Sequence, residues 1–159
     1  NKSCKTHGAN CDGACVDPNV DNGMMTKVWG PAGWLFLHCI TFGYPYAINP
    51  NNEAHLNKKK DYFNFFYNLG NVLPCKYCRE SYKVYFDELD LMNSLNTRKD
   101  IVKWLYDMHN KINRKLGVPD CNIPSIKEVE KRYEQFRAKC KKTSEEESRK
   151  KRHTKLINT

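Results

Sequence analysis

Apolar residues recur every three or four positions through the middle of the chain, and this spacing is typical of amphipathic helices. No segment alternates apolar and polar residues convincingly, as a half-buried strand does. The pattern therefore predicts an all-α fold, a four-helix bundle with a short fifth helix. The predicted helices cover residues 31–42, 53–69, 75–89 and 97–116, and the fifth follows residue 124.

Residues that favour helix ends mark these boundaries. Pro31 suits the first turn of the first helix, and Gly70 suits the end of the second. Thr97 and Asp100 form a pair like a capping box before the fourth helix, and Ser125, with a glutamate three residues later, does the same before the fifth. The fourth helix consequently has the best-defined ends in the chain.

The two ends of the chain differ from this apolar middle. Residues 1–27 are rich in Gly, Asn and Asp and carry three cysteines, so we expect a flexible leader. Residues 141–159 are expected to form a basic, solvated tail. Residues 28–140 then form the single folded domain that a chain of 159 residues can support.

The formal net charge of +9 resembles that of a nucleic-acid-binding protein, but it is unevenly distributed. Residues 137–159 hold nine Lys or Arg and three Glu, a net +6, which leaves +3 for residues 1–136. We therefore expect no nucleic-acid partner. No apolar run reaches the roughly 18 residues that a membrane span needs, so no membrane partner is expected either.

Eight cysteines are many for a protein of this size in a reducing compartment. They predict either an oxidising location or a protein that makes disulfides itself. Cys39 lies alone among apolar residues. The others lie in the leader (Cys4, Cys11, Cys15), in the centre (Cys75, Cys78) and around the last helix (Cys121, Cys140).

Cys75 and Cys78 begin the third predicted helix, and their spacing puts them one turn apart on one face, close enough for a disulfide. A helix N-terminus favours thiolate over thiol and so activates a cysteine there. The pair alone leaves three interpretations open: a redox disulfide, half of a zinc site or an inert structural disulfide. A thioredoxin-like protein is disfavoured, because its cysteine pair lies in a βαβ pattern that this chain lacks.

Two further stretches gather flat rings and amide groups. Trp34 and His38 lie on the first helix, while His109 and Asn113 share a face of the fourth, with Asn110 beside them. Such groups suit a flat heteroaromatic ligand that carries a ribose. The alternative is a packed core in which neighbouring residues satisfy the histidines.

These stretches together resemble the Erv/ALR family of FAD-linked sulfhydryl oxidases. The resemblance covers about residues 28–140 and is much more specific than the cysteine pair, because four motifs occur in the family's order and spacing. The last motif follows the family pattern HNxVNxxLGK with two changes. Ile112 replaces the valine, and Val118 replaces the lysine, which removes a potential contact with the cofactor phosphates. The motifs lie at residues 29–38, 44–45, 74–78 and 104–117.

The resemblance implies a helical bundle, commonly a homodimer, that holds FAD non-covalently beside the cysteine pair. It places the flavin against the first helix and the adenosine half against the fourth, with Arg114 or Lys115 reaching the pyrophosphate. The family often has a tryptophan in its last helix, where this chain has Tyr133 or Phe136. The residues assigned to the cofactor are Gly30, Gly33, Trp34, His38 and Tyr44, and then His109, Asn110, Asn113, Arg114, Lys115, Leu116 and Tyr133.

The resemblance also implies the reaction. A substrate thiolate attacks the Cys75–Cys78 disulfide, the resulting dithiol passes two electrons to FAD, and oxygen accepts them to give hydrogen peroxide. Thiol-containing protein substrates and molecular oxygen are the expected partners. We expect Cys75 to be the more exposed sulfur, which substrate attacks, and Cys78 to face Trp34, His38 and the flavin.

The remaining cysteines also have counterparts in the family. Members usually carry a mobile shuttle dithiol outside the core, for which Cys11 and Cys15 are the candidates, with Cys4 as a rival partner. A structural leader disulfide is the alternative. A later pair ties the last helix over the cofactor in the family, and Cys121 and Cys140 match its order, so we expect them to form a structural disulfide.

A competing, non-enzymatic interpretation is a helical scaffold in which Cys11 and Cys15 join Cys75 and Cys78 in a four-cysteine zinc site. Under the oxidase interpretation no metal is expected. Proteins of the family occur in the mitochondrial intermembrane space, in the endoplasmic reticulum and in large DNA viruses. The Asn- and Lys-rich composition favours the viral kind, for which the host cytoplasm or the virion is the expected location.

Overall fold

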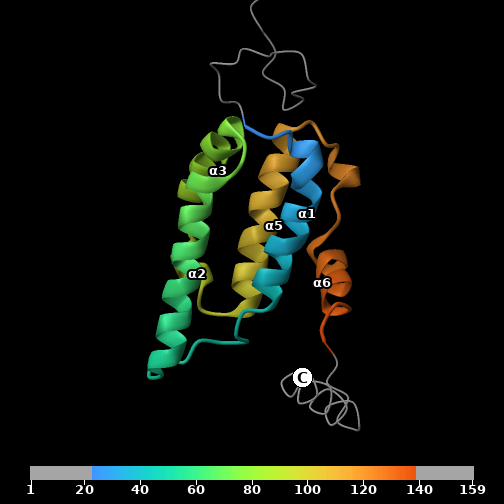
Figure 1. Ribbon diagram of the computed structural model, residues 1–159. Coiled ribbons are helices and arrows are strands. Elements are labelled where there is room, and N and C mark those ends of the chain that lie inside the picture. The colour runs from blue at the N-terminus through green and yellow to red at the C-terminus, as the bar shows by residue number, and fades with distance from the viewer. Residues whose placement is uncertain (1–22, 139–159) are drawn as a thin grey trace, which may run out of the picture.

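The computed structural model describes residues 23–138, and helices dominate this part of the chain (Figure 1). The expected all-α fold is confirmed, since the described residues form no strand, only two isolated bridges. The elements are α1 (Thr26–Phe42), α2 (Glu53–Val72), α3 (Lys76–Glu88), α4 (Leu91–Ser94), α5 (Arg98–Lys115), the 3-10 turn η1 (Asp120–Asn122) and α6 (Ile126–Glu134). Figure 1 shows α2 and α3 on one side, α1 and α5 on the other, and α6 outside α1. Between residues 23 and 138, no helix is both long and apolar enough to cross a membrane.

Helix α5 is the central element and packs against α1, α3 and α4. Thr97 caps its start by accepting a hydrogen bond from the backbone N of Asp100 at 3.2 Å, as the capping pattern predicted. Gly117 follows its end at a φ of +76°, a conformation that glycine adopts readily. Leu105 and Met108 are fully buried on its inner face, and burial of such a side chain is worth about 1.5–3 kcal/mol.

The first helix starts at Thr26, earlier than predicted. Pro31 therefore lies inside α1 and not in its first turn. Met25 occupies the N-cap position without a capping side chain, so no local signal marks this start. The extra turn is held by the Trp29 indole, whose Nε1 donates to the carbonyl of Met24 at 3.2 Å. Residues 26 and 27, which the sequence placed in the leader, therefore belong to the folded helix.

Gly70 does not end α2, contrary to the prediction, because the helix continues to Val72. It lies where α2 packs closely on α3. A Cβ atom at Gly70 would lie 2.8 Å from the ring of Tyr82. The glycine therefore permits contact between two helices. Two elements, α4 and η1, were not predicted at all, because three or four residues are too few to show a periodic pattern.

The main core lies between α1, α2, α3 and α5, and its buried polar groups are satisfied. Tyr82 donates its hydroxyl to the carbonyl of Phe66 at 2.8 Å, and Trp104 donates to the carbonyl of Leu89 at 3.3 Å. The buried members of this cluster are Leu37, Tyr44, Phe66, Tyr82, Leu91, Leu95, Ile101, Trp104, Leu105 and Met108.

A second, smaller core joins α6 to the bundle. It consists of Phe42, Val102, Val129 and Tyr133, with Tyr106 packed against it. The capping box predicted at Ser125 is present and starts the helix. The last helix thus depends on few apolar contacts.

Candidate redox and cofactor-binding site

The central cysteine pair forms a disulfide at the start of α3. Cys75 is the N-cap residue, and its Sγ accepts a hydrogen bond from the backbone N of Cys78 at 3.2 Å. The two Cα atoms are 5.1 Å apart, which is within the usual range for a disulfide. The predicted geometry of this pair is therefore confirmed, and a backbone N–H of the helix N-terminus points at the Cys75 sulfur.

The expectation that Cys75 is the more exposed sulfur is wrong, since the residue is only 8% exposed whereas Cys78 is half-buried. A short segment at residues 23–25 runs beside it. Gly23 forms an antiparallel bridge with Cys75, and the backbone N of Met24 donates to the carbonyl of Pro74 at 2.5 Å. Gly23 has a φ of +77°, and a Cβ there would lie 2.2 Å from the Pro74 oxygen, so this close approach requires glycine.

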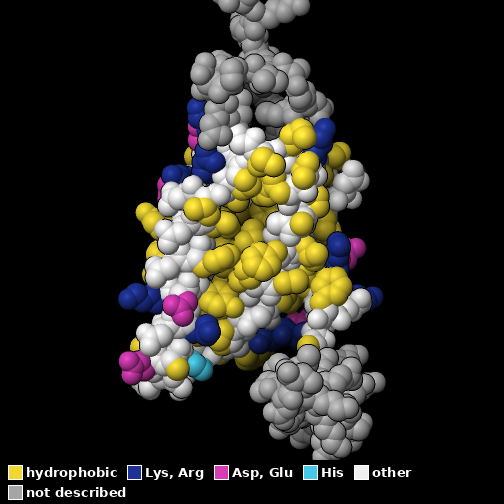
Figure 2. All heavy atoms as spheres, in the orientation of Figure 1, with side chains coloured by type: hydrophobic (Ala, Val, Ile, Leu, Met, Phe, Trp, Pro, Cys, Tyr) yellow, Lys and Arg dark blue, Asp and Glu magenta, His cyan; other side chains and the backbone are white. Residues whose placement is uncertain are grey.

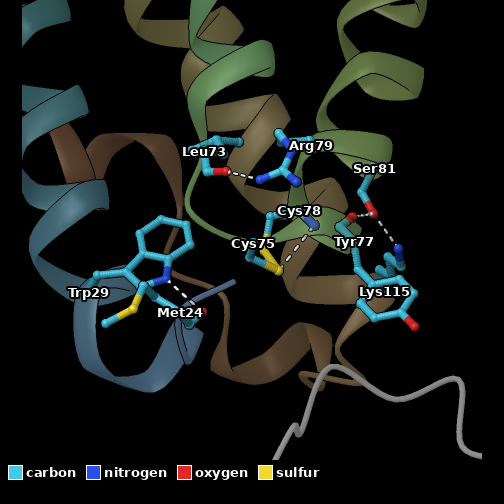
Figure 3. Close-up of a disulfide and its surroundings, with 9 residues drawn as sticks. All are labelled: Met24, Trp29, Leu73, Cys75, Tyr77, Cys78, Arg79, Ser81 and Lys115. Carbon is cyan, nitrogen blue, oxygen red and sulfur yellow. Dashed lines mark hydrogen bonds between the residues drawn. A yellow bond between two sulfur atoms is a disulfide. The ribbon is translucent and has the colours of Figure 1, made fainter. Parts of the chain in front are cut away.

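Three polar side chains fix the surroundings of the disulfide. Arg79 Nη1 donates to the carbonyl of Leu73 at 2.6 Å, which ties the loop before Cys75 to the first turn of α3. On the other side, Lys115 Nζ donates to the buried Ser81 Oγ, which donates to the Tyr77 carbonyl at 2.8 Å (Figure 3). The C-terminal end of α5 therefore lies next to the face of α3 that carries Cys78, one turn before Ser81.

The two predicted histidines meet between α1 and α5. His38 Nε2 and His109 Nδ1 are 3.2 Å apart, and the Trp34 ring stacks on His109 with 3.8 Å between ring centroids. Burial lowers the pKa of His38 to about 4, helped by repulsion from His109 and Arg132, and burial also lowers the pKa of His109 to about 4. Both rings are therefore neutral at pH 7. His38 Nδ1 is buried without a hydrogen-bond partner, so it is available to a ligand.

A cavity of about 200 Å³ adjoins this pair, between α5, α6 and the buried side of α1. Asn110 and Asn113 line it together, with Asn113 Nδ2 3.4 Å from Asn110 Oδ1. The cavity thus combines flat rings, neutral nitrogens and amide groups. Its lining residues are His38, Tyr106, His109, Asn110, Asn113, Pro124, Glu128, Val129, Arg132 and Tyr133.

Several cavity residues were not predicted from the sequence, notably Tyr106, Glu128 and Arg132. A signal existed, since Glu128 and Arg132 are four residues apart and share a helix face with Val129 and Tyr133 nearby. That face would be assigned to solvent from its charges. Only the packing of α6 against α1 turns it toward the cavity.

Tyr44 was wrongly assigned to the cofactor. It is fully buried in the main core, and its hydroxyl donates to the carbonyl of Leu95 at 2.8 Å. Burial, with a smaller contribution from Tyr62, raises the pKa of Tyr44 to about 12. Its role is structural, at the turn after α1.

The other predicted cofactor residues do not line this cavity. A Cβ atom at Gly30 would meet no other atom within 4 Å, whereas a Cβ at Gly33 would lie 3.4 Å from the Trp29 ring. Arg114 Nε pairs with Asp120 Oδ1 at 3.1 Å, and Leu116 is 49% exposed. The predicted pyrophosphate contacts of Arg114 and Lys115 stay predictions.

The remaining cysteines are separate from the central pair. Cys39 and Cys121 are exposed and free within the described part of the chain. Cys140 and the leader cysteines lie outside the described residues, so the Cys121–Cys140 disulfide and the shuttle stay predictions. Residues 23–138 contain no group of three or more His, Cys, Asp or Glu side chains that could hold a metal ion.

Comparison with known proteins identifies the family. The family model described as Erv1/Alr matches residues 31–134, from the Trp34 helix through the cysteine pair to α6. The chain belongs to the Erv1/Alr family. This match spans every element of the cavity and of the disulfide loop.

Relatives of the Erv1/Alr chain come from viruses and from fungi. It is 36% identical over 110 residues to a probable FAD-linked sulfhydryl oxidase of Acanthamoeba polyphaga mimivirus, a match that covers 68% of this chain and 73% of the relative. An FAD-linked sulfhydryl oxidase of African swine fever virus is 30% identical over 107 residues, 67% of this chain and 81% of the relative. The mitochondrial FAD-linked sulfhydryl oxidase erv1 of Schizosaccharomyces pombe is 26% identical over 103 residues, 64% of this chain but only 53% of that protein.

The fold has a solved counterpart in the same family. The crystal structure of the FAD-binding domain of Erv1 from Saccharomyces cerevisiae superposes with a TM-score of 0.60, covering 72% of this chain and 99% of that domain at 23% identity. The helical bundle described above is therefore the Erv1 fold.

Proposed function

We propose that this protein is an FAD-linked sulfhydryl oxidase that forms disulfides in thiol-containing proteins and uses molecular oxygen as the final acceptor. The observation that carries the proposal is the Cys75–Cys78 disulfide at the N-terminus of α3, which packs against α5. The histidine and amide groups of α5 line a cavity together with residues of α1 and α6. Its relatives of 30% identity or more are named for this activity.

The cavity residues fit the adenosine half of FAD. His38 Nδ1 offers a buried polar atom that has no partner in the protein, and Asn113 offers amide groups to a ribose or a base edge. Tyr133 presents a flat ring on the wall formed by α6, where the family often has tryptophan. When bound, FAD supplies a two-electron acceptor that oxygen can reoxidise.

The protein's own chemistry is thiol–disulfide exchange. A substrate thiolate attacks one sulfur of the disulfide and forms a mixed disulfide, while the other sulfur leaves as a thiolate stabilised by the α3 N-terminus. A second substrate thiolate then attacks the mixed disulfide, which releases oxidised substrate and leaves Cys75 and Cys78 as a dithiol. Reoxidation of this dithiol gives up two electrons and two protons.

The two sulfurs have different surroundings, which favours different roles. Cys75 adjoins the segment at residues 23–25, through which the cysteine-bearing leader enters the domain. Cys78 lies one turn before Ser81, on the side of α3 that contacts Lys115 of α5. We therefore assign Cys75 to the substrate or shuttle thiol, once residues 23–25 move, and Cys78 to the cofactor.

The leader and a second copy of the chain complete the proposal. Cys11 and Cys15 would carry electrons from bulky protein thiols to Cys75, which small thiols reach directly. The homodimer would use the apolar surface over the middle of the bundle in Figure 2. Phe36 of α1 and Phe65 of α2 are exposed by 61% and 37%. A groove of about 330 Å³ lies on α2 beside Phe65.

The purified full chain tests this function directly. We expect visible flavin absorbance, oxidation of dithiothreitol with oxygen uptake, and loss of flavin reduction in the Cys75→Ser/Cys78→Ser variant. The matched control is Cys39→Ser, which removes an exposed cysteine outside the site. A colourless protein that releases one zinc ion on denaturation would instead establish the four-cysteine scaffold.

A further inference from the structure

Helix α6 is attached to the bundle more weakly than the other long helices. Its nine residues are fewer than the roughly 12 to 15 that an isolated helix needs to persist in water. It is held by the small apolar cluster of Phe42, Val102, Val129 and Tyr133, which is separate from the main core. Its helical state therefore depends on docking.

The same helix forms one wall of the cavity. Val129, Arg132 and Tyr133 line the cavity from α6, whereas His38 and His109 line it from α1 and α5. The Tyr133 ring lies 4.9 Å from the His38 ring and stacks on Phe42 with 5.2 Å between centroids. Undocking of α6 would open the cavity to solvent.

Arg137 joins the end of α6 to the end of α1. Its Nη2 donates to the carbonyl of Phe42 at 3.1 Å and to Glu134 Oε1 at 2.7 Å. The pair with Glu134 also uses Arg137 Nε, so three hydrogen bonds orient the guanidinium. Phe42 is the last residue of α1, whose final turn carries no basic residue.

This contact has a physical reason. The last four carbonyls of a helix have no partner within the helix, and its C-terminal end carries a partial negative charge. Arg137 supplies a donor and a cation at that end from a position 95 residues later. At the other end of α6 the link to the bundle is an uncharged hydrogen bond, which the Tyr106 hydroxyl donates to the Pro124 carbonyl at 3.0 Å.

We propose that α6 is a lid whose docking is coupled to cofactor binding, and that Arg137 is the positioning residue that latches it to the C-terminal end of α1. The inference rests on the proposed assignment of the cavity to FAD. The apparent affinity for a ligand falls in proportion to the fraction of molecules in the competent state. If α6 docks fully only when the cavity is filled, a weaker latch weakens binding without unfolding the bundle.

The test compares Arg137→Gln with Lys131→Gln in the full chain. Both changes remove one positive charge from the end of the same helix, and both side chains reach solvent, but only Arg137 contacts α1 in the described structure. FAD is removed and titrated back by fluorescence quenching. Loss of one charged hydrogen bond should raise the Kd of Arg137→Gln about five- to twentyfold, with Lys131→Gln unchanged.

Two further measurements separate a lid from a static brace. Thermal unfolding of Arg137→Gln should match wild type without FAD and fall below it when FAD is saturating. Hydrogen exchange of wild type should show α6 protected only with FAD bound, while α5 stays protected in both states.

Each other outcome contradicts one part of the proposal. Equal loss of thermal stability with and without FAD, or equal protection of α6 in both states, overturns the lid. An unchanged FAD Kd in Arg137→Gln overturns the latch. A wild-type chain that binds no FAD at all refutes the proposed function itself, which distinguishes that failure from failure of the lid.

Discussion

Mild acid should destabilise this protein through the buried histidine pair. Burial keeps the pKa of His38 and of His109 at about 4 in the folded protein, against about 6.5 for a histidine in an unfolded chain. The unfolded state therefore binds protons between these values, while the folded state does not. The histidine pair therefore lowers the free energy of unfolding very little above pH 6.5, and lowers it progressively as the pH falls from 6.5 toward 4.

The size of this effect follows from the two pKa values. At pH 5 each histidine favours the unfolded state by about 2 kcal/mol, whereas at pH 7 it does so by about 0.2 kcal/mol. The pair should therefore remove about 3–4 kcal/mol of unfolding free energy between pH 7 and pH 5. His38 adjoins the Tyr133 ring, and its two neighbours that can carry a positive charge, His109 and Arg132, both disfavour a proton on its ring.

The assay is urea unfolding of the full chain with saturating FAD, the state in which α6 is docked, at several pH values, with His38→Gln/His109→Gln as the control. The double variant should lose the slope between pH 5 and pH 7, although it is less stable at pH 7. Three carboxylates are shifted away from this window. Hydrogen bonds from Asn93, Ser125 and Arg137 lower the pKa values of Asp90, Glu128 and Glu134, respectively.

Two results would refute the reasoning. The first is an equal pH slope in wild type and the double variant. The second is an NMR titration in which either ring protonates near pH 6.5 in the folded protein.

Three further predictions concern packing and disulfides. Gly70→Ala should lower the free energy of unfolding by about 1–3 kcal/mol, because the new methyl group would lie 2.8 Å from a tyrosine ring of α3. Urea unfolding measures this change, and an unchanged midpoint would contradict the prediction. Gly23→Ala should displace the segment over Cys75 and speed alkylation of Cys75 in the reduced protein, measured by mass spectrometry; an unchanged rate would show that the segment does not limit access. Replacing Cys121 and Cys140 by serine should cost about 2–4 kcal/mol of stability, whereas free thiols at both positions in non-reduced peptide mapping would show that no disulfide forms.

Local patterns in the sequence predicted most helices and the position of the central cysteine pair at a helix start. The period of apolar residues located α2, α3, α5 and α6, and the capping residues Thr97 and Ser125 fixed two of their starts. The spacing of Cys75 and Cys78 predicted that they lie close enough for a disulfide at a helix start for the same reason, since residues three apart lie one turn apart. Each of these features depends on neighbours within a few residues.

Contacts between distant residues could not be predicted in this way. Tyr44 was assigned to the cofactor on a motif, but packing put it in the core with its hydroxyl on Leu95. The burial of Cys75 was missed because its cover, at residues 23–25, comes from a segment about 50 positions earlier.

The sequence by itself therefore determined which residues form helices and which chemical groups they carry. Tertiary structure alone decided which of these groups meet. His38 contacts His109 across 71 positions, and Arg137 contacts Phe42 across 95. Helical periodicity tells which side of a helix is apolar, but the neighbour that a side chain reaches depends on how whole helices pack, and that is set by the sum of many weak contacts.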